Sequence, residues 1–513
     1  MGASCLIIGM AQIKKQTFQS TIFSYLSAAV GLVTQGYVIP NFFATDQNGL
    51  ISLFLSLMLL LPLFANLGFN GAGTRYFPYF RDAKTNDHGY VFLALLFSFI
   101  GFIIVVVALW FFKDGLIEEY QKKSLLLVRY YPYLLPIVAF MLIFNVFDVY
   151  SRLHYDSVTG TFLSQFVLRL NNLVVALLYA FRWINFDQFM MIWCAGISLP
   201  MILIVLKTIR EGRFSLRPDF GFLKQSQLLV PILKFCALSI IASLSSQIVL
   251  YIDKIMITDM IDLNAVGVYS TASFFGTVIA MPMIAMQLIA GTIVAEAWKN
   301  NDHENIAKIY QKSCLVQLFV GLWVFLGICV NLDNIFEFLP PAYEAGRWVI
   351  VWIGLSKVLD MATGINGTIL NTSKYYYLDT IFFIVLIFCT VLLNHQLIPT
   401  FGIEGAAIGA VVSVFIYNLC RYGLLWYLFG FQPFNSKNAI VVGMGIAAFG
   451  LVSLLPSLTG SPIAILGDMA YRSVTITLLF VGGFYVSGYS PEFNQQCTTI
   501  YQKLWGIVGK PKR

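Results

Sequence analysis

The sequence predicts an all-α polytopic membrane protein with about 14 transmembrane helices. Hydrophobic residues make up 58% of the 513 residues and charged residues 11%, against about 25% charged residues in ordinary soluble domains. Fourteen apolar blocks follow one another, each near the roughly 20 residues that a helix needs to cross a bilayer. Lipid offers backbone groups no hydrogen-bond partner, and the alternating pattern of a barrel is missing, so we expect the blocks to be helices.

The blocks are separated by short polar gaps along the whole chain. In order they cover residues 17–39, 47–69, 90–112, 126–147, 161–181, 184–206, 230–252, 266–294, 314–332, 347–370, 376–396, 403–428, 438–457 and 469–487.

The distribution of cations predicts the orientation. Of the 32 Lys and Arg residues, 20 fall in alternate gaps or at the termini, 4 fall in the opposite gaps, and 8 lie within or at the edges of blocks. Cytoplasmic loops carry the excess of Lys and Arg, so both termini are expected in the cytoplasm. The net charge of +7 follows from this bias and indicates no nucleic-acid partner.

The basic gap 207–229 is predicted to divide the chain into halves. We expect an N-terminal six-helix bundle at 1–206, a cytoplasmic basic linker at 207–229, a C-terminal six-helix bundle at 230–428, helices 13 and 14 within 429–490, and a cytoplasmic basic tail at 491–513. The separation of Lys15 and Gly49 nearly repeats in Lys234 and Gly267. Six helices per half predict a parallel repeat with a pseudo-two-fold axis along the membrane normal. Residues 1–9 are interpreted as a dispensable extension before Met10.

The motifs argue against an enzyme. The chain contains no GxxxxGK[ST] nucleotide loop, no HExxH and no CxxC, and its four His and eight Cys residues are scattered. No hydrophilic gap exceeds about two dozen residues, which disfavours a polymerase or acyltransferase with a large outer loop. We therefore predict no catalytic residues, no metal and no cofactor.

Several local strings resemble the polysaccharide transporters, or lipid-linked oligosaccharide flippases of the O-antigen type, in the multidrug/oligosaccharidyl-lipid/polysaccharide exporter superfamily. The strings are IKKQTFQSTIFSYLSAAVGL with TDQNGLISL, ANLGFNGAGTR (65–75), YIDKIMI…NAVGVYSTA (251–272) and GIEGAAIGAVVS (402–413). The resemblance covers about residues 12–490. Asn66 stands where that family usually has Asp, and Asn41 stands where an Arg often precedes the first outer turn, so charge roles at those two points do not carry over.

Charged residues inside the blocks are the candidate site residues. A charge at the bilayer centre costs at least about 2.5–3.5 kcal/mol, so it normally faces a partner or a cavity. Arg and Lys suit a phosphate-bearing lipid head. The candidate cavity cations are Arg169, Lys357, Arg129, Arg421, Lys234 and Arg75; the coupling or gating candidates are Asp360, Asp148 and Asp253; the polar cavity candidates are Gln35, Gln247 and Asn366.

Structural interpretations of these residues stay open beside the functional ones. Lys357 and Asp360 are spaced to form an ion pair on one helix face. Asp253, with Lys254, is equally well placed to cap helix 7 at the outer surface. Arg129 and Arg421 suit snorkelling, and the polar residues suit hydrogen bonds between helices.

The resemblance implies a flippase that moves a polyprenyl-pyrophosphate-linked oligosaccharide from the cytoplasmic to the outer leaflet for surface polysaccharide or lipopolysaccharide biosynthesis, by alternating access around a cationic cavity. The bilayer is that of the bacterial inner membrane, and a polysaccharide polymerase and a chain-length regulator are the implied partners. Coupling to H⁺ or Na⁺ is left open. The alternatives are a cation-coupled multidrug antiporter of the same superfamily and a lipid II flippase.

Overall fold

The computed structural model describes residues 26–82, 85–113, 124–458 and 460–488, together with residues 19, 23, 24, 115, 117 and 495. The predicted extension 1–9 and all but one residue of the predicted tail 491–513 lie outside the described residues. Two compact units are present: unit 1 comprises residues 1–274 and 383–409, and unit 2 comprises residues 275–382 and 410–513. The predicted bundles, linker and tail stay a prediction.

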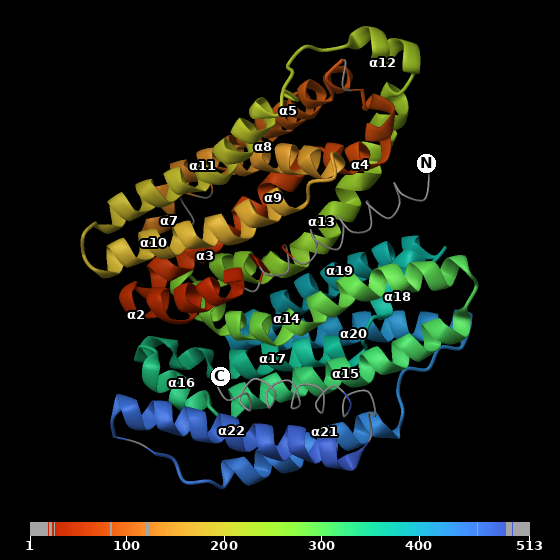
Figure 1. The fold of residues 1–513 in the computed structure, drawn as a ribbon. Helices are drawn as coiled ribbons and strands as arrows, with labels where there is room; N and C mark the ends of the chain where they lie inside the picture. Colours follow the sequence, from red (N-terminus) through yellow and green to blue (C-terminus); the bar gives the residue numbers. More distant parts are fainter. Residues whose placement is uncertain are drawn as a thin grey trace, which may run out of the picture. The chain divides into compact units, whose positions relative to one another are not determined.

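The first described helix of unit 1 lies in the first apolar block, and the other helices of the unit follow it along the chain (Figure 1). It contains η1 (Thr34–Val38), α2 (Ile39–Phe42), α3 (Thr45–Ala65), α4 (Phe69–Phe80), η2 (Asp87–Gly89), α5 (Tyr90–Phe111), α7 (Leu125–Tyr130), η3 (Tyr131–Tyr133), α8 (Leu134–Leu153), α9 (Val158–Thr161), η4 (Phe162–Val167), α10 (Leu168–Ala180), α11 (Phe186–Arg210), α12 (Phe220–Ser226) and α13 (Leu229–Met260). One apolar core, with Trp193, Phe54 and Phe147 fully buried, joins these helices.

Unit 2 contains the later helices. They are α15 (His303–Cys329), α16 (Leu332–Phe338), η5 (Pro341–Gly346), α17 (Arg347–Ala362), α18 (Asn366–Thr372), α21 (Ser436–Ser453) and α22 (Pro462–Ser487), while α14 (Leu263–Lys299), α19 (Tyr376–Phe401) and α20 (Ile403–Phe429) each contribute residues to both units. One core cluster packs α15 against α21 and α22, with Phe319 stacked on Phe480 and Phe484.

Local sequence signals set several helix ends. The Asn185 side chain accepts from the Gln188 backbone N–H, and the Gln188 side chain accepts from the Asn185 N–H, which is a capping box at the start of α11. The Ser461 hydroxyl accepts from the Ala464 N–H, and Pro462 occupies the first position of α22, where its missing N–H costs nothing.

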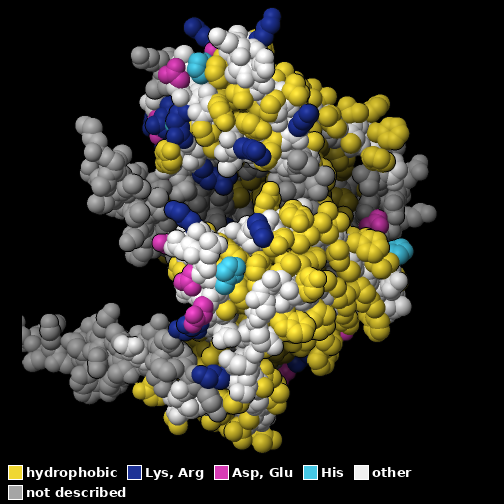
Figure 2. Space-filling view, turned by 90° about the vertical axis from the view of Figure 1, so that its right-hand side faces the viewer, with side chains coloured by type: hydrophobic (Ala, Val, Ile, Leu, Met, Phe, Trp, Pro, Cys, Tyr) yellow, Lys and Arg dark blue, Asp and Glu magenta, His cyan; other side chains and the backbone are white. Residues whose placement is uncertain are grey.

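The structure confirms an all-α polytopic membrane fold. Every described residue in regular structure is helical, and each of the 14 predicted blocks overlaps a helix. Among the described residues, 11 helices are long and apolar enough to cross a membrane, or 12 if the bent pair α17 and α18 is one span. The number 14 stays a prediction. Figure 2 shows wide hydrophobic areas on the surface, and exposed side chains such as Ile104, Trp110 and Phe388 suit contact with lipid.

A close crossing of α3 and α14 involves the two glycines of the predicted repeat. A Cβ on Gly49 would lie 1.8 Å from the Leu263 carbonyl oxygen, and one on Gly267 would lie 2.1 Å from the Thr45 carbonyl oxygen. The two contacts have the same form, since each glycine faces the residue four positions before the other. The backbones therefore approach closely because both side chains are missing, as in other small-residue crossings in membranes.

Candidate functional site

Arg169 lies near the start of α10 and reaches across to the first helix. Its Nη1 donates to the Ser27 carbonyl oxygen at 3.0 Å, and a Cβ on Gly31 would lie 2.9 Å from that nitrogen. The side chain is half-buried and has no ion-pair partner among the described residues. A guanidinium has five donors, so one hydrogen bond leaves most of its capacity for an anion.

Two turns of π-helix lie close to this arginine. η4 ends two residues before Arg169, and η1 lies in the first helix. In η4, Gln165 accepts from Ser24 through its side-chain oxygen and from Ser27 through its carbonyl oxygen, at 2.8 and 2.7 Å. We call Ser24, Ser27, Gln165 and Arg169 the Arg169 cluster. Sequence reasoning missed the π turns, which are frequent at functional sites.

Arg75 and Lys234 form a second, exposed group of cations on unit 1. The Arg75 guanidinium lies 4.9 Å from the centre of the Phe235 ring, next to Lys234 on α13. Neither cation has an acidic partner in the described part of the chain. α4 and α13 pack closely here, because a Cβ on Gly71 would lie 1.8 Å from the Ser239 hydroxyl oxygen. The two cations are therefore available to an anion, and they equally satisfy the positive-inside interpretation.

In unit 2, predicted residues gather at a break in helix 10. α17 ends at Ala362 and α18 begins at Asn366, with a bend of 51° between the segments, and Gly364 adopts a positive φ of 63° at the break. The Asn418 side chain donates to Asp360 at 3.0 Å and accepts from Thr363 at 2.9 Å and Asn366 at 2.8 Å. We call Asp360, Thr363, Asn366 and Asn418 the helix-break cluster.

Lys357 does not pair with Asp360. No ion pair joins them, and Lys357 has no partner among the described residues, so the predicted pairing is wrong. Its aliphatic stem lies beside Gly276 at the start of the unit 2 part of α14. Arg169 and Lys357 belong to different units, and a cavity shared by both stays a prediction.

Arg421 does not snorkel. It is 8% exposed, and its guanidinium makes a bidentate ion pair with Asp379 at 2.7 and 2.9 Å. The guanidinium carbon also lies 4.0 Å from the centre of the Tyr417 ring. An arginine buried in a span needs such a partner, because an uncompensated charge there is costly. Arg421 therefore acts as a structural ion-pair residue in this conformation.

Asp253 is a hydrogen-bonding centre and does not cap α13, which continues to Met260. Its carboxylate accepts from the Tyr269 hydroxyl at 2.7 Å and from the Asn394 side chain at 2.8 Å. These residues come from α13, α14 and α19. The capping interpretation was wrong because the helix extends beyond the apolar block, so Asp253 lies well inside it.

The remaining candidates are scattered over unit 1. Arg129 pairs with Asp187 at 2.7 Å on the surface, and Asp148 pairs with Arg152 at 2.8 Å near the end of α8. Gln35 lies in η1 and is half-buried; Gln247 is half-buried in α13. Among the described residues, no hydrogen bond or ion pair joins them to the Arg169 cluster or to the helix-break cluster.

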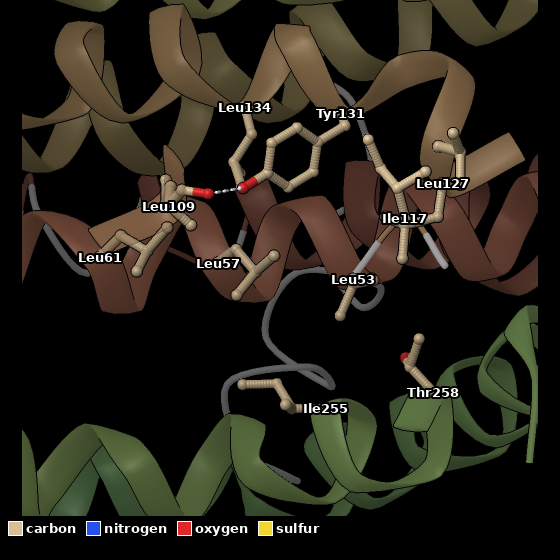
Figure 3. Close-up of a pocket in the computed structure, with 11 residues that line it drawn as sticks. Leu53, Leu57, Leu61, Leu109, Ile117, Leu127, Tyr131, Leu134, Ile255 and Thr258 are labelled. Atoms are coloured by element: carbon tan, nitrogen blue, oxygen red, sulfur yellow. Dashed lines mark hydrogen bonds between the residues drawn. The ribbon is translucent and has the colours of Figure 1, made fainter. Parts of the chain in front are cut away.

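An apolar pocket of about 180 Å³ lies in unit 1 (Figure 3). It is lined by Leu53, Leu57, Leu61, Leu109, Ile117, Leu127, Val128, Tyr131, Leu134, Ile255 and Thr258. The hydroxyls of Tyr131 and Thr258 donate to the carbonyl oxygens of Leu109 and Lys254, at 2.9 and 2.7 Å. The lining thus presents hydrocarbon, and it suits an acyl or prenyl chain better than a sugar.

Comparison with known proteins places the chain in a family. The sequence model of the family described as "Polysaccharide biosynthesis protein" matches residues 13–294, more than half of the chain. The chain belongs to this polysaccharide biosynthesis protein family. The resemblance inferred from local strings is therefore confirmed.

The sequence also matches one curated relative over part of its length. It is 25% identical over 179 residues to the "Probable low-salt glycan biosynthesis flippase Agl15" of Haloferax volcanii; the match covers 34% of this chain and 37% of the length of that relative. A structure of "Lipid II flippase MurJ, inward closed conformation" superposes with a TM-score of 0.68 at 13% identity, covering 91% of this chain and 99% of the other.

A second structure supports the same fold. An "Inward-facing conformation of a multidrug resistance MATE family transporter of the MOP superfamily" superposes with a TM-score of 0.58 at 14% identity, covering 80% of this chain and 94% of the other. At such identities the likeness establishes the fold alone. These similar proteins are named as flippases or transporters, which fits a protein that is not an enzyme.

Sequence reasoning missed several polar residues that build the clusters. Asp379, Asn394 and Asn418 are buried partners of predicted residues. Asp379 had a signal, because a carboxylate near the start of an apolar block is costly in lipid and needs a cation. The two asparagines had none, since an amide within a span is compatible with many environments.

Proposed function

We propose that this protein is a flippase for a polyprenyl-pyrophosphate-linked oligosaccharide, moving it from the cytoplasmic to the outer leaflet of a bacterial inner membrane for surface polysaccharide biosynthesis. The observation that carries the proposal is Arg169, a half-buried guanidinium within a span that has no acidic partner among the described residues. Such a cation suits an anionic head group screened from bulk water. Family membership and the fold support the same conclusion.

The proposed mechanism is alternating access without bond chemistry. Unaided crossing would expose sugar and phosphate groups to hydrocarbon at several kcal/mol each. In our proposal the head group passes along polar side chains of both halves, among them the Arg169 cluster and Lys357, while the prenyl chain stays in lipid. The close crossing of α3 and α14 is the contact that must open on the outer side.

The driving force in this proposal is a gradient of H⁺ or Na⁺ or the membrane potential, and no cofactor takes part. Asp253 and Asp360 are carboxylates within spans whose neighbours include neutral amide and hydroxyl groups. Moving one elementary charge across the membrane is worth about 2.3 kcal/mol per 100 mV. A polysaccharide polymerase and a chain-length regulator are the proposed partners that act on the product.

The state of Asp148 favours a flippase over a multidrug antiporter. A cation-coupled antiporter of this superfamily is expected to carry acidic residues deep in the N-terminal half. Here Asp148 lies near a helix end and is paired with Arg152, and position 66 is the neutral Asn66, whose side chain donates to Ser98. A lipid II flippase differs only in the head group and is distinguished by substrate.

The test measures leaflet accessibility of labelled lipid-linked oligosaccharide in vesicles with and without the purified protein. We expect the protein to make the inner-leaflet pool accessible to an impermeant sugar-oxidising reagent, and Arg169→Gln to slow this. Labelled lipid II serves as the parallel substrate. Equal accessibility with and without protein overturns the flippase proposal, and proton-coupled dye efflux in the same vesicles would favour the antiporter.

A further inference from the structure

A second apolar groove lies on unit 1, where α5 and α8 run side by side (Figure 1). Its volume is about 490 Å³. The lining comes from α5, α8 and one residue of the loop before α12: Phe92, Leu95, Leu96, Ser98, Phe99, Phe102, Ala139, Leu142, Ile143 and Leu216. None of the candidate residues described above lines this groove.

The groove is suited to hydrocarbon. Ser98 is the one polar side chain in its lining, and its hydroxyl accepts a hydrogen bond from Asn66 at 3.2 Å. α5 belongs to the span with a mean hydropathy of 3.1, of which only 33% is buried inside the protein. An apolar helix that the protein leaves largely uncovered is expected to contact lipid chains.

The length of the groove matches one leaflet. Its α5 residues run from Phe92 to Phe102, ten residues on, which corresponds to roughly 15 Å at about 1.5 Å per residue. The hydrocarbon core of a bilayer is about 30 Å thick. A chain lying along the groove would therefore extend from one membrane surface to the bilayer middle.

One end of the groove carries cations. Leu216 contributes to the lining there, and Arg217 follows it directly in the chain. Arg217 is exposed and has no ion-pair partner among the described residues, whereas Arg213 pairs with Glu211 at 3.1 Å. The segment 207–229 contains five cations and two acids, so a negative group at this end meets a complementary charge.

Contacts on both sides hold this loop in place. The Phe214 ring stacks on Phe147 of α8 at 6.1 Å between ring centres. Farther along, His88 Nδ1 lies 2.8 Å from an Asp219 carboxylate oxygen, and the Phe222 ring stacks on the His88 ring at 4.0 Å. The arginines are therefore carried by an ordered segment at the end of the groove.

We propose that the α5–α8 groove binds an anionic phospholipid of the leaflet nearest the loop, with one acyl chain along α5 and the phosphate at Arg217. The occupant is a membrane phospholipid, because the groove is apolar, is about as long as one leaflet is thick and ends at the exposed Arg217. This inference does not depend on the proposed transport activity.

Native mass spectrometry of the purified full-length protein tests the site. The protein is titrated with phosphatidylglycerol and, separately, with phosphatidylcholine. We expect phosphatidylglycerol to bind more tightly, and Arg217→Gln to weaken it about fivefold, which corresponds to the ~1 kcal/mol contributed by one cation near a membrane surface. The matched control is Lys299→Gln, which removes an exposed cation of unit 2, away from the groove on unit 1. This variant should bind phosphatidylglycerol as the parent does.

A second pair of variants in the same experiment tests the groove itself. Ala139→Phe should reduce the occupancy of both lipids, whereas Ala108→Phe, on an exposed position of α5 outside the lining, should not. If Ala139→Phe does not fold, Leu216→Ser replaces it, because Leu216 is already 50% exposed. Equal affinity for the two phospholipids, or unchanged binding in both Arg217→Gln and the groove variant, would overturn the proposal. Displacement of phosphatidylglycerol by a short-chain polyprenyl phosphate, but not by phosphatidylcholine, would assign the groove to the prenyl lipid and would equally overturn it.

Discussion

Replacing Gly49 or Gly267 by alanine is expected to open the crossing of α3 and α14. The added Cβ would lie 1.8 Å from the Leu263 carbonyl oxygen in the first variant and 2.1 Å from the Thr45 carbonyl oxygen in the second. A carbon and a carbonyl oxygen pack at about 3.3–3.6 Å. The backbones must therefore separate by roughly 1.5 Å at Gly49 and slightly less at Gly267.

The energetic effect follows from what has to move. The clashing atoms are backbone atoms of a helix, so no side-chain rotation relieves the overlap, and overpacking of this kind costs about 1–3 kcal/mol. A second conformation in which the crossing is broken is not destabilised by the added carbon. The ratio of closed to open molecules then shifts by about 5-fold to 150-fold.

Disulfide trapping measures the shift. The Thr45 hydroxyl donates to the Asn264 side-chain oxygen at 2.6 Å, so cysteines at these two positions lie across the crossing. In a variant without the eight native cysteines, we expect rapid cross-linking by a mild oxidant and a lower yield when Gly49→Ala or Gly267→Ala is added. Cross-linked protein should stop moving lipid-linked oligosaccharide, and a reducing agent should restore it.

The control is Gly423→Ala, because a Cβ at Gly423 meets nothing within 4 Å. It should leave the cross-linking yield unchanged. Full cross-linking in both folded alanine variants would refute the reasoning, since it would mean that the crossing tolerates the added carbon without separating.

Three further predictions concern charged side chains. Arg169→Gln should lower flipping about tenfold or more with little effect on thermal unfolding, and Arg169→Lys should retain more activity; equal losses would contradict an anion-binding role. Arg421→Met should destabilise the protein by about 3–5 kcal/mol in thermal unfolding because it leaves Asp379 buried and unpaired, and adding Asp379→Leu should restore most of the loss. Burial raises the pKa of Asp156. The hydrogen bonds from Lys207 and Thr159 lower it by more than burial raises it, so the pKa of Asp156 lies below the ordinary value of about 3.9. The resulting stabilisation is therefore present above about pH 4 and is lost as the pH falls through the folded-state pKa, so the difference in unfolding temperature between the parent and Asp156→Asn should shrink from pH 6 to pH 3.

The helical architecture was predictable because a bilayer imposes one requirement on every span. Apolar blocks of suitable length have to be helices, and each predicted block overlaps one. The positions of helix ends were less predictable where polar residues continue a helix beyond an apolar block. Asp253 and Lys254 follow the seventh apolar block, yet α13 continues to Met260, and the Asp253 carboxylate accepts hydrogen bonds from Tyr269 and Asn394 on neighbouring helices.

The break in helix 10 shows another limit. Thr363 and Gly364 do not lower the hydropathy enough to end a block, so one continuous helix was expected between 347 and 370. Gly364 takes a left-handed conformation that glycine adopts readily, and a Cβ there would also lie 2.6 Å from the Cys314 sulfur. At the break the Thr363 hydroxyl donates to the Asp360 carbonyl oxygen at 2.8 Å, and this compensation for lost helical hydrogen bonds becomes visible only in three dimensions.

The structure separates cations that looked equivalent in the sequence. Arg169 and Arg421 both lie within apolar blocks, and hydropathy assigns them the same cost. Arg421 directs its guanidinium to the Asp379 carboxylate with two hydrogen bonds, so its charge is neutralised by the fold. Arg169 has a carbonyl oxygen as its hydrogen-bond acceptor and lies over Gly31, which leaves its charge uncompensated among the described residues. A half-buried charge of that kind is tolerated more easily when an anion visits it, so removing Arg421 should impair folding while removing Arg169 should impair transport.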